Sequence, residues 1–281
     1  MPSPTVIAQY LLPKQGLTRL CGALARRQGG SATQAVIQRF IRQYRVDMSE
    51  AAESDPAAYG SFNEFFTRAL RPGVRPLADT PLVCPVDGAV SQLGPIRDGR
   101  IFQAKGHEYT CTALLGGDEA LASQFRDGQF ATLYLSPRDY HRIHMPCEGQ
   151  LEQMIHVPGA LFSVSPATAA GVPGLFARNE RVVCVFEAPW GPWVMVLVGA
   201  TIVGSMATVW HGVVNTERPG HIRRWQYPGD GEPVLLEKGA EMGRFLLGST
   251  VVMLFPAGAP KLPTDWQPGQ AVRMGQAMVA V

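Results

Sequence analysis

Cysteine is scarce in this sequence, and its pattern excludes two kinds of stabilising site. The five cysteines (Cys21, Cys84, Cys111, Cys147 and Cys184) are odd in number and include no C-x-x-C pair. Neither a disulfide framework nor a zinc knuckle is therefore indicated. The first residues also lack the short basic segment, continuous apolar core and small-residue cleavage site of a signal peptide. These absences predict a reducing, cytosolic setting.

Acidic residues are absent from the first 46 positions. That stretch carries seven basic side chains, whereas the rest of the chain carries 18 basic and 23 acidic ones. The formal net charge of +2 thus hides an N-terminal excess of positive charge. Such an asymmetry predicts either an anionic partner or a solvated basic face.

Charged residues are also missing between Glu187 and Glu217, where the run WVMVLVGATIVGSMATVW is strongly apolar. The run is long enough for a transmembrane helix. Glycine and proline interrupt the uncharged segment, however, and Val, Ile and Thr dominate it. This composition favours two buried strands that break between Gly199 and Gly204.

Glycine (30 residues) and proline (23 residues) are both abundant and are spread along the chain. This distribution suits many short strands joined by tight turns. From Pro76 onward, short apolar runs alternate with such turns: PVDGAVSQLG, FATLYLSP, RVVCVFEA, WVMVLVGA and STVVMLF. We predict an α+β fold that is mainly β, with N-terminal amphipathic helices in residues 1–75 and a β-rich, barrel-sandwich-like body in residues 76–281.

The helices of the first region have basic side chains beside an apolar stripe. Apolar residues recur at intervals of three and four within 17–24 and 36–44, and Arg39, Arg42 and Arg45 lie beside those of the second range. Such helices either lie in a membrane interface or pack on the protein with their arginines in water. A capping box, Ser61 to Glu64, then predicts a further short helix. These residues alone leave the membrane question open.

An apolar strand pattern is interrupted near the C-terminus, in the stretch GRFLLGSTVVMLF. Gly248, Ser249 and Thr250 separate two runs that are each typical of a strand. A serine hydroxyl is a poor nucleophile unless a base takes its proton and a carboxylate orients that base. A functional Ser249 would therefore need a histidine and an acid from elsewhere in the chain.

The stretch SPRDYHRIHMPCEG offers His141 and His144 directly after an apolar strand. Metal binding by this pair would need a third ligand, and spacing identifies none, so we expect no metal. Asp87 lies in a Pro-x-Asp-Gly turn, where an aspartate usually bonds its own backbone. On local grounds each of these residues has a structural as well as a catalytic interpretation.

Taken together, these motifs resemble those of one family, the bacterial phosphatidylserine decarboxylase proenzymes. The resemblance covers most of the chain from Ser61 to Pro256, in the order found in the family. Six stretches carry it: FNEFFTRALRPGVRP, CPVDGAV, SPRDYHRIHMPCEG, LFSVSPATAAGVPGLFARNERVVCVF, VLVGATIVGSMATVW and KGAEMGRFLLGSTVVMLFP.

The resemblance implies a self-cleavage site at the Gly248–Ser249 bond. His144, oriented by Asp87, would take the proton of Ser249, and Ser249 would become a pyruvoyl group that forms a Schiff base with the substrate. His141 would assist decarboxylation. The products would be a β-chain of residues 1–248 and an α-chain of residues 249–281, and no metal is implied.

The resemblance also implies conversion of phosphatidylserine to phosphatidylethanolamine and CO2. The expected enzyme is a β/α heterodimer within a homo-oligomer. It would bind the cytoplasmic side of the cell membrane peripherally, through the basic amphipathic helices, and would not bind nucleic acid. Two alternatives stay open: a pyruvoyl decarboxylase of a soluble amine, and a non-enzymatic barrel-like carrier module, which the glycine turns suggest.

Overall fold

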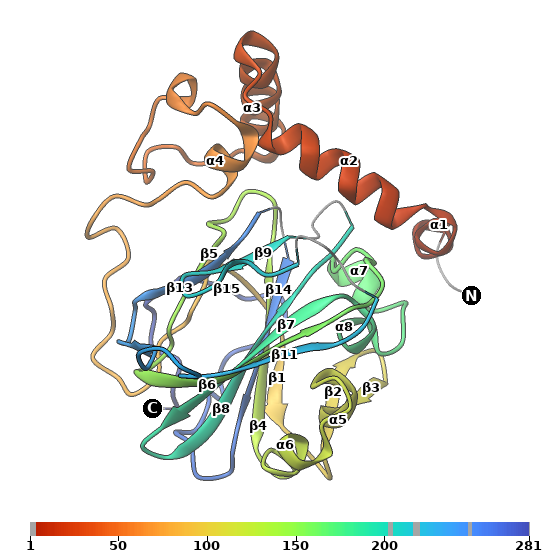
Figure 1. The fold of residues 1–281 in the computed structure, drawn as a ribbon, viewed down its shortest axis with the longest axis vertical. Helices are drawn as coiled ribbons and strands as arrows, with labels where there is room; N and C mark the ends of the chain where they lie inside the picture. Colours follow the sequence, from red (N-terminus) through yellow and green to blue (C-terminus); the bar gives the residue numbers. More distant parts are fainter. Residues whose placement is uncertain (1–3, 202–204, 216–219, 247–248, 281) are drawn as a thin grey trace.

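The computed structural model describes residues 4–201, 205–215, 220–246 and 249–280, and it divides into a helical N-terminal part and a β-rich body (Figure 1). The predicted α+β, mainly β class is confirmed. The helices of the N-terminal part are α1 (Pro4–Leu11), α2 (Lys14–Arg26), α3 (Gly30–Tyr44), the 3-10 turn η1 (Pro56–Ala58) and α4 (Phe62–Phe66).

The short helix α4 begins with the predicted capping box. The Ser61 hydroxyl accepts a hydrogen bond from the backbone nitrogen of Glu64 at 3.2 Å, and the Glu64 carboxylate accepts one from Gly60 at 2.8 Å. These bonds satisfy donors that a helix start leaves unpaired. The start of α4 is thereby fixed, and Phe65 and Phe66 turn into a small core beneath α3.

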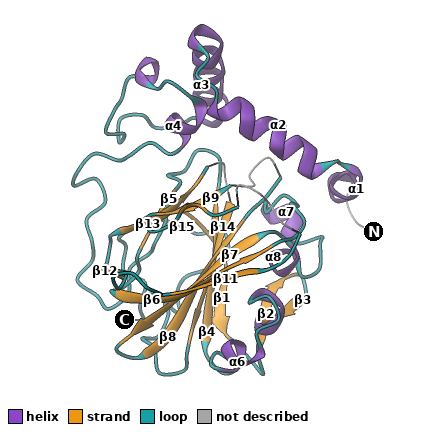
Figure 2. Cartoon of the chain, in the orientation of Figure 1, coloured by secondary structure: helices purple, strands orange, loops and turns teal. Residues whose placement is uncertain are grey.

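The body is built on one nine-stranded sheet and one four-stranded sheet (Figure 2). Strand order in the large sheet is β11 (Arg223–Gln226), β6 (Gly149–Val157), β7 (Arg181–Ala188), β8 (Gly191–Val198), β14 (Ser249–Phe255), β4 (Gln129–Leu135), β1 (Gly88–Pro95) and β15 (Ala271–Val272), with β12 (Leu235–Leu236) also paired to β6. The small sheet has the order β10 (Gly212–Val213), β9 (Met206–Thr208), β13 (Glu241–Phe245) and β5 (Arg142–His144).

A separate hairpin and four short helices complete the body. They are β2 (Arg100–Ala104), β3 (His107–Thr110), α5 (Cys111–Leu114), α6 (Glu119–Ser123), α7 (Pro166–Ala169) and α8 (Leu175–Arg178). The apolar run of the uncharged segment forms the two strands β8 and β9, as predicted, and β10 follows them within the same segment. Among the described residues, no helix combines the length and the apolar character that crossing a bilayer requires.

The large sheet is open rather than closed into a barrel, because the order of its described strands runs from one edge to the other. The predicted barrel-sandwich-like body is thus a β-rich body whose described strands do not close into a barrel. Both faces of the sheet are covered by core: Val251 and Met253 of β14 point into one apolar cluster, and Val252 and Leu254 point into a second. Because a core covers each face, the central strands are buried from water although the sheet does not close into a barrel.

The first helix connects the N-terminal part to the body. Val6 of α1 is buried in the same cluster as α7 and α8, and it lies against Gly171. The Gln9 side chain accepts a hydrogen bond from the backbone nitrogen of Ser163 at 2.9 Å. The helical part is therefore fixed to the body at α1 as well as through α4.

Candidate active site

Three of the four candidate residues, His141, His144 and Ser249, lie in or beside segments that connect the two sheets, whereas Asp87 lies directly before β1. Ser249 is the first residue of β14, and its backbone pairs with Leu135 at the end of β4. The backbone nitrogen of Phe245, the last residue of β13, donates to the carbonyl of His141 at 3.0 Å. Two parts of the chain far apart in sequence, 136–141 and the residues between β13 and β14, thus join the same pair of sheets.

Gly248 lies outside the described residues, and Ser249 is described through its backbone alone. The predicted interruption between the two strands is confirmed, because β13 ends at Phe245 and β14 begins at Ser249. The two strands belong to different sheets. The interruption is therefore the point at which the chain passes from one sheet to the other.

His144 is the last residue of β5 and is half-buried. Its Nδ1 lies 2.8 Å from the carbonyl oxygen of Gly239, and its Nε2 lies 3.0 Å from the hydroxyl of Tyr140. Its backbone nitrogen donates to Pro85, in the turn that carries Asp87. Burial lowers the pKa of His144, against the opposing effects of the Gly239 carbonyl and the Glu241 carboxylate. The ring is therefore neutral near pH 7.

Within the described part of the chain, the Asp87 carboxylate makes its hydrogen bonds with Arg75 and Met274 and not with His144. Its carboxylate accepts from Arg75 Nε at 2.9 Å and from the backbone nitrogen of Met274 at 2.9 Å, and it forms an ion pair with the same guanidinium. Arg75 also binds Glu50 at 2.6 Å. The described atoms do not form the hydrogen bond from Asp87 to His144 that the resemblance implies, because both ring nitrogens have other partners. Asp87 acts on His144 through space, where its charge raises the pKa of the imidazole.

His141 is fully buried, directly before β5. Its Nδ1 lies 2.8 Å from the backbone carbonyl of Asp139, and its ring packs on Phe66 with centroids 4.0 Å apart. Burial lowers the pKa of His141 to about 3. Its Nε2 is buried and has no hydrogen-bond partner among the described residues. A buried acceptor without a partner is costly, so its presence calls for an explanation, and a catalytic role is one.

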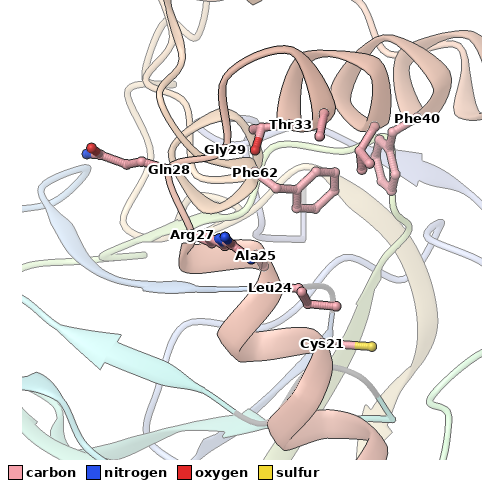
Figure 3. A pocket seen from close by; sticks show the side chains of 11 residues that line it. Cys21, Leu24, Ala25, Arg27, Gln28, Gly29, Thr33, Phe40 and Phe62 are labelled. Carbon is pink, nitrogen blue, oxygen red and sulfur yellow. The ribbon is translucent and has the colours of Figure 1, made fainter.

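An apolar cavity of about 770 Å³ lies between α2, α3 and α4 (Figure 3). Figure 3 shows Phe40 and Phe62 side by side, with Leu24 and Cys21 of α2 on the opposite side of the cavity. Phe62 also stacks on Phe66, with centroids 5.9 Å apart. The short helix α4 therefore separates this cavity from His141, and its aromatic rings contact both.

Three site residues were not singled out from the sequence: Tyr140, Gly239 and Arg75. All three lie in the stretches that carry the family resemblance, but none has a spacing that reveals its partner. Gly239 reaches His144 across 95 residues of sequence and Arg75 reaches Asp87 across 12. Within the described ranges, no group of three or more His, Cys, Asp or Glu side chains is placed to hold a metal ion.

Comparisons with known proteins cover almost the whole chain. The family model described as phosphatidylserine decarboxylase matches residues 62–280, and a second model described as PSD matches residues 4–45. A phosphatidylserine decarboxylase proenzyme of Polaromonas naphthalenivorans (strain CJ2) is 65% identical over 277 residues, which are 98% of this chain and 96% of that protein.

Proteins with the same name from two further organisms are equally similar. That of Acidovorax ebreus (strain TPSY) is 67% identical over 273 residues, with 97% of this chain and 96% of the relative covered. That of Azoarcus sp. (strain BH72) is 68% identical over 273 residues, with 97% and 94% covered.

Proposed function

The chain belongs to the phosphatidylserine decarboxylase family, and we propose that it makes its catalytic carbonyl from its own Ser249. It is an enzyme, a lyase that converts phosphatidylserine to phosphatidylethanolamine and CO2. The word proenzyme in the names of the relatives implies that the chain processes itself. This assignment replaces both the carrier-module alternative and the soluble-amine alternative.

The proposed cleavage site is the Gly248–Ser249 bond. The observation that carries it is the position of Ser249 as the first residue of β14, paired with Leu135 where β4 leads into the segment of His141 and His144. Hydrogen bonding from Phe245 to His141 brings the end of β13 to the same segment. Backbone pairing alone thus supports placing a serine hydroxyl close to two neutral imidazoles.

In the proposed maturation, His144 Nε2 accepts the hydroxyl proton of Ser249 as Oγ attacks the carbonyl carbon of Gly248. The amide becomes an ester, and the proton passes from His144 to the released amine. β-Elimination then separates residues 1–248 from a dehydroalanine at position 249. Addition of water and loss of ammonia leave a pyruvoyl group at the new N-terminus. A neutral His144, which burial favours, is the form that can begin this sequence.

For Asp87 we propose an electrostatic role. When His144 holds the serine proton it is a cation, and the Asp87 carboxylate favours that cation through space. The Gly239 carbonyl, rather than Asp87, orients the ring through Nδ1. Arg75 and the Met274 backbone hold Asp87 in place. The proposed triad is thus completed by charge and by a backbone carbonyl.

For His141 we propose a part in the decarboxylation step. A pyruvoyl group supplies a carbonyl that condenses with the substrate's amine and accepts the electron pair left when CO2 departs. The buried Nε2 of His141 has no hydrogen-bond partner among the described residues, so it is available to a group of the substrate.

The two chains would stay together after cleavage. β14 lies between β4 and β8 in the large sheet and pairs with both over most of its length. Further along the small chain, β15 pairs with β1, and Met274 bonds Asp87. These contacts are not changed when the backbone is cut at residue 248. We therefore expect a stable β/α heterodimer, and a homo-oligomer of it stays a prediction.

We propose that the basic amphipathic helices bind the membrane peripherally, on its cytoplasmic side. Six arginines lie in or beside α2 and α3, and all are exposed: Arg19, Arg26, Arg27, Arg39, Arg42 and Arg45. Among the described residues, none of the six forms an ion pair with an acidic side chain. Leu20, Leu24 and Val36 on the same helices are more than half exposed. Unpaired cations beside exposed apolar groups suit an anionic lipid surface.

Intact-mass measurement of the purified protein under denaturing conditions tests the proposed function. We expect chains of residues 1–248 and 249–281, the smaller one lighter than its sequence by the mass of one ammonia. Ser249→Ala should remain a full-length, folded and inactive chain, because the change removes the nucleophile with little loss of packing. Ser123→Ala, a serine on α6 far from the site, is the control and should mature normally. Normal cleavage of Ser249→Ala would refute the mechanism.

A further inference from the structure

Tyr140 contacts the one nitrogen of His144 that a base would use. Its hydroxyl lies 3.0 Å from His144 Nε2, and the two rings lie 5.6 Å apart at 31°. Tyr140 is buried, and a turn holds it from the N-terminal side: Asp139 accepts from Ser136 through its side chain at 2.7 Å. The position of the hydroxyl is therefore set by packing and by the turn.

The direction of this hydrogen bond follows from the other side of the ring. A backbone carbonyl can only accept, so the 2.8 Å contact with Gly239 requires the hydrogen of His144 to lie on Nδ1. A neutral imidazole then has its lone pair on Nε2, and Tyr140 must be the donor. The backbone nitrogen of Gly239 donates to Met145 at 2.9 Å, which fixes the carbonyl in turn.

We propose that Tyr140 is a positioning residue for self-cleavage, which together with the Gly239 carbonyl holds His144 in the tautomer whose Nε2 carries the lone pair. The inference rests on the proposed role of His144 as the base. Tyr140 itself keeps its proton, because burial raises its pKa to about 12. The serine hydroxyl then takes the place of Tyr140 as the donor to a lone pair that is already oriented.

Several charged groups act on this pair from the neighbouring elements. Glu241 of β13 and Asp87 of the turn before β1 favour the protonated form of His144, whereas Arg142 of β5 opposes it. Arg244 of β13 also acts on Tyr140. Tyr140→Phe leaves all four in place, so a change in the titration of His144 in that variant is assigned to the lost hydroxyl.

The test compares maturation rates of full-length chains made by cell-free synthesis and then chased between pH 5 and pH 9. Tyr140→Phe should cleave roughly tenfold more slowly, because part of His144 then adopts the other tautomer or the imidazolium, neither of which has a lone pair on Nε2. A hydrogen bond to the neutral imidazole disfavours its charged form, so losing it should raise the pKa of His144. The acidic limb of the rate profile should therefore move up by roughly half to one pH unit.

Tyr59→Phe is the matched control. Tyr59 is also buried and donates its hydroxyl to a backbone carbonyl, that of Glu53 at 2.6 Å, but it does not touch His144. This variant should mature at the wild-type rate with an unshifted limb. A Tyr140→Phe chain with the wild-type rate and limb, or a faster one, would overturn the inference. Complete loss of cleavage would also overturn it, in favour of proton transfer through Tyr140.

A second measurement does not depend on cleavage. Nitrogen-15 spectra of the histidines in the Ser249→Ala chain should show His144 protonated on Nδ1 alone, and Tyr140→Phe should add the other tautomer or the imidazolium near pH 7. An unchanged spectrum would contradict the positioning role. His144→Ala distinguishes the role of His144 from that of Tyr140. Normal maturation of His144→Ala would refute the proposed role of His144 as the base. If His144→Ala does not mature but Tyr140→Phe matures normally, only the positioning role of Tyr140 is refuted.

Discussion

The N-terminal helices and the β-rich body use apolar side chains in opposite ways. Seven of the 13 large hydrophobic side chains that are exposed in the described structure lie within the first 44 residues. The core of the helical part consists of five buried residues, Ile37, Val46, Tyr59, Phe65 and Phe66. The body instead buries its strands between two large clusters, one on each face of the sheet. Apolar surface is thus available for a partner in one region and for stability in the other.

The catalytic candidates lie where these two regions meet. Phe66 of α4 packs on His141, and Arg75, which follows the helical part, holds Asp87. A helical part that contacts a membrane would therefore lie directly against the residues that are proposed to act on the lipid. Although its own core is small, the helical part therefore contacts the candidate site directly.

The largest expected effect is a difference between the two regions in how much the loss of one leucine side chain lowers the free energy of unfolding. In the Ser249→Ala chain, Leu254→Ala should lower the free energy of unfolding by about 2–5 kcal/mol, because Leu254 is fully buried in β14 and leaves a cavity. Leu24→Ala removes the same atoms from an exposed position on α2 and should change that free energy by less than about 0.5 kcal/mol. Denaturant unfolding followed by circular dichroism measures both, and equal losses would break the comparison.

The next prediction concerns pH at the boundary between the regions. The pKa of His141 is about 3 in the folded protein, below its ordinary value, so the unfolded chain binds the proton that the folded chain does not. The free energy of unfolding should therefore decrease as the pH drops below about 6.5. At pH 5 the protonation of His141 in the unfolded chain should have lowered it by about 2 kcal/mol.

His141→Asn keeps a donor for the Asp139 carbonyl and removes this titration. Its free energy of unfolding should fall less between pH 7 and pH 5 than that of the parent, by about 2 kcal/mol. His107→Asn, on the β2–β3 hairpin, controls for the loss of a histidine elsewhere. Identical pH dependence in His141→Asn and the parent would mean that His141 does not stay neutral in the folded state.

The smallest expected effect tests the helical part alone. Arg39→Gln on α3 should weaken binding to vesicles that contain anionic lipid by about fivefold, the equivalent of about 1 kcal/mol. The difference should shrink as NaCl is added, because salt screens exposed charges. Arg126→Gln, an exposed arginine of the body that pairs with Asp98, should bind vesicles like the wild type. Equal losses in the two variants would remove the special role of the helices.

Periodicity identified most elements in advance because each is decided locally. The apolar runs that predicted strands became β1, β4, β7, β8 and β14, and the spacing of Ser61 and Glu64 predicted the start of α4. The pattern within a strand does not predict, however, which strands pair at the edges of the sheet. Within the predicted barrel-sandwich-like body the large sheet is open, because closure depends on which strands pair at the edges.

The sequence by itself determined the family and the reaction, and it nominated Asp87, His141, His144 and Ser249 as candidate site residues, since they lie in motifs that can be recognised without a fold. Only the tertiary structure decided which atoms face one another. Arg75 rather than His144 binds Asp87, and Tyr140 and Gly239 rather than Asp87 bind His144. The physical reason is that hydrogen bonds act over about 3 Å, and contacts of that length between distant segments arise from strand pairing and packing, which no local pattern encodes.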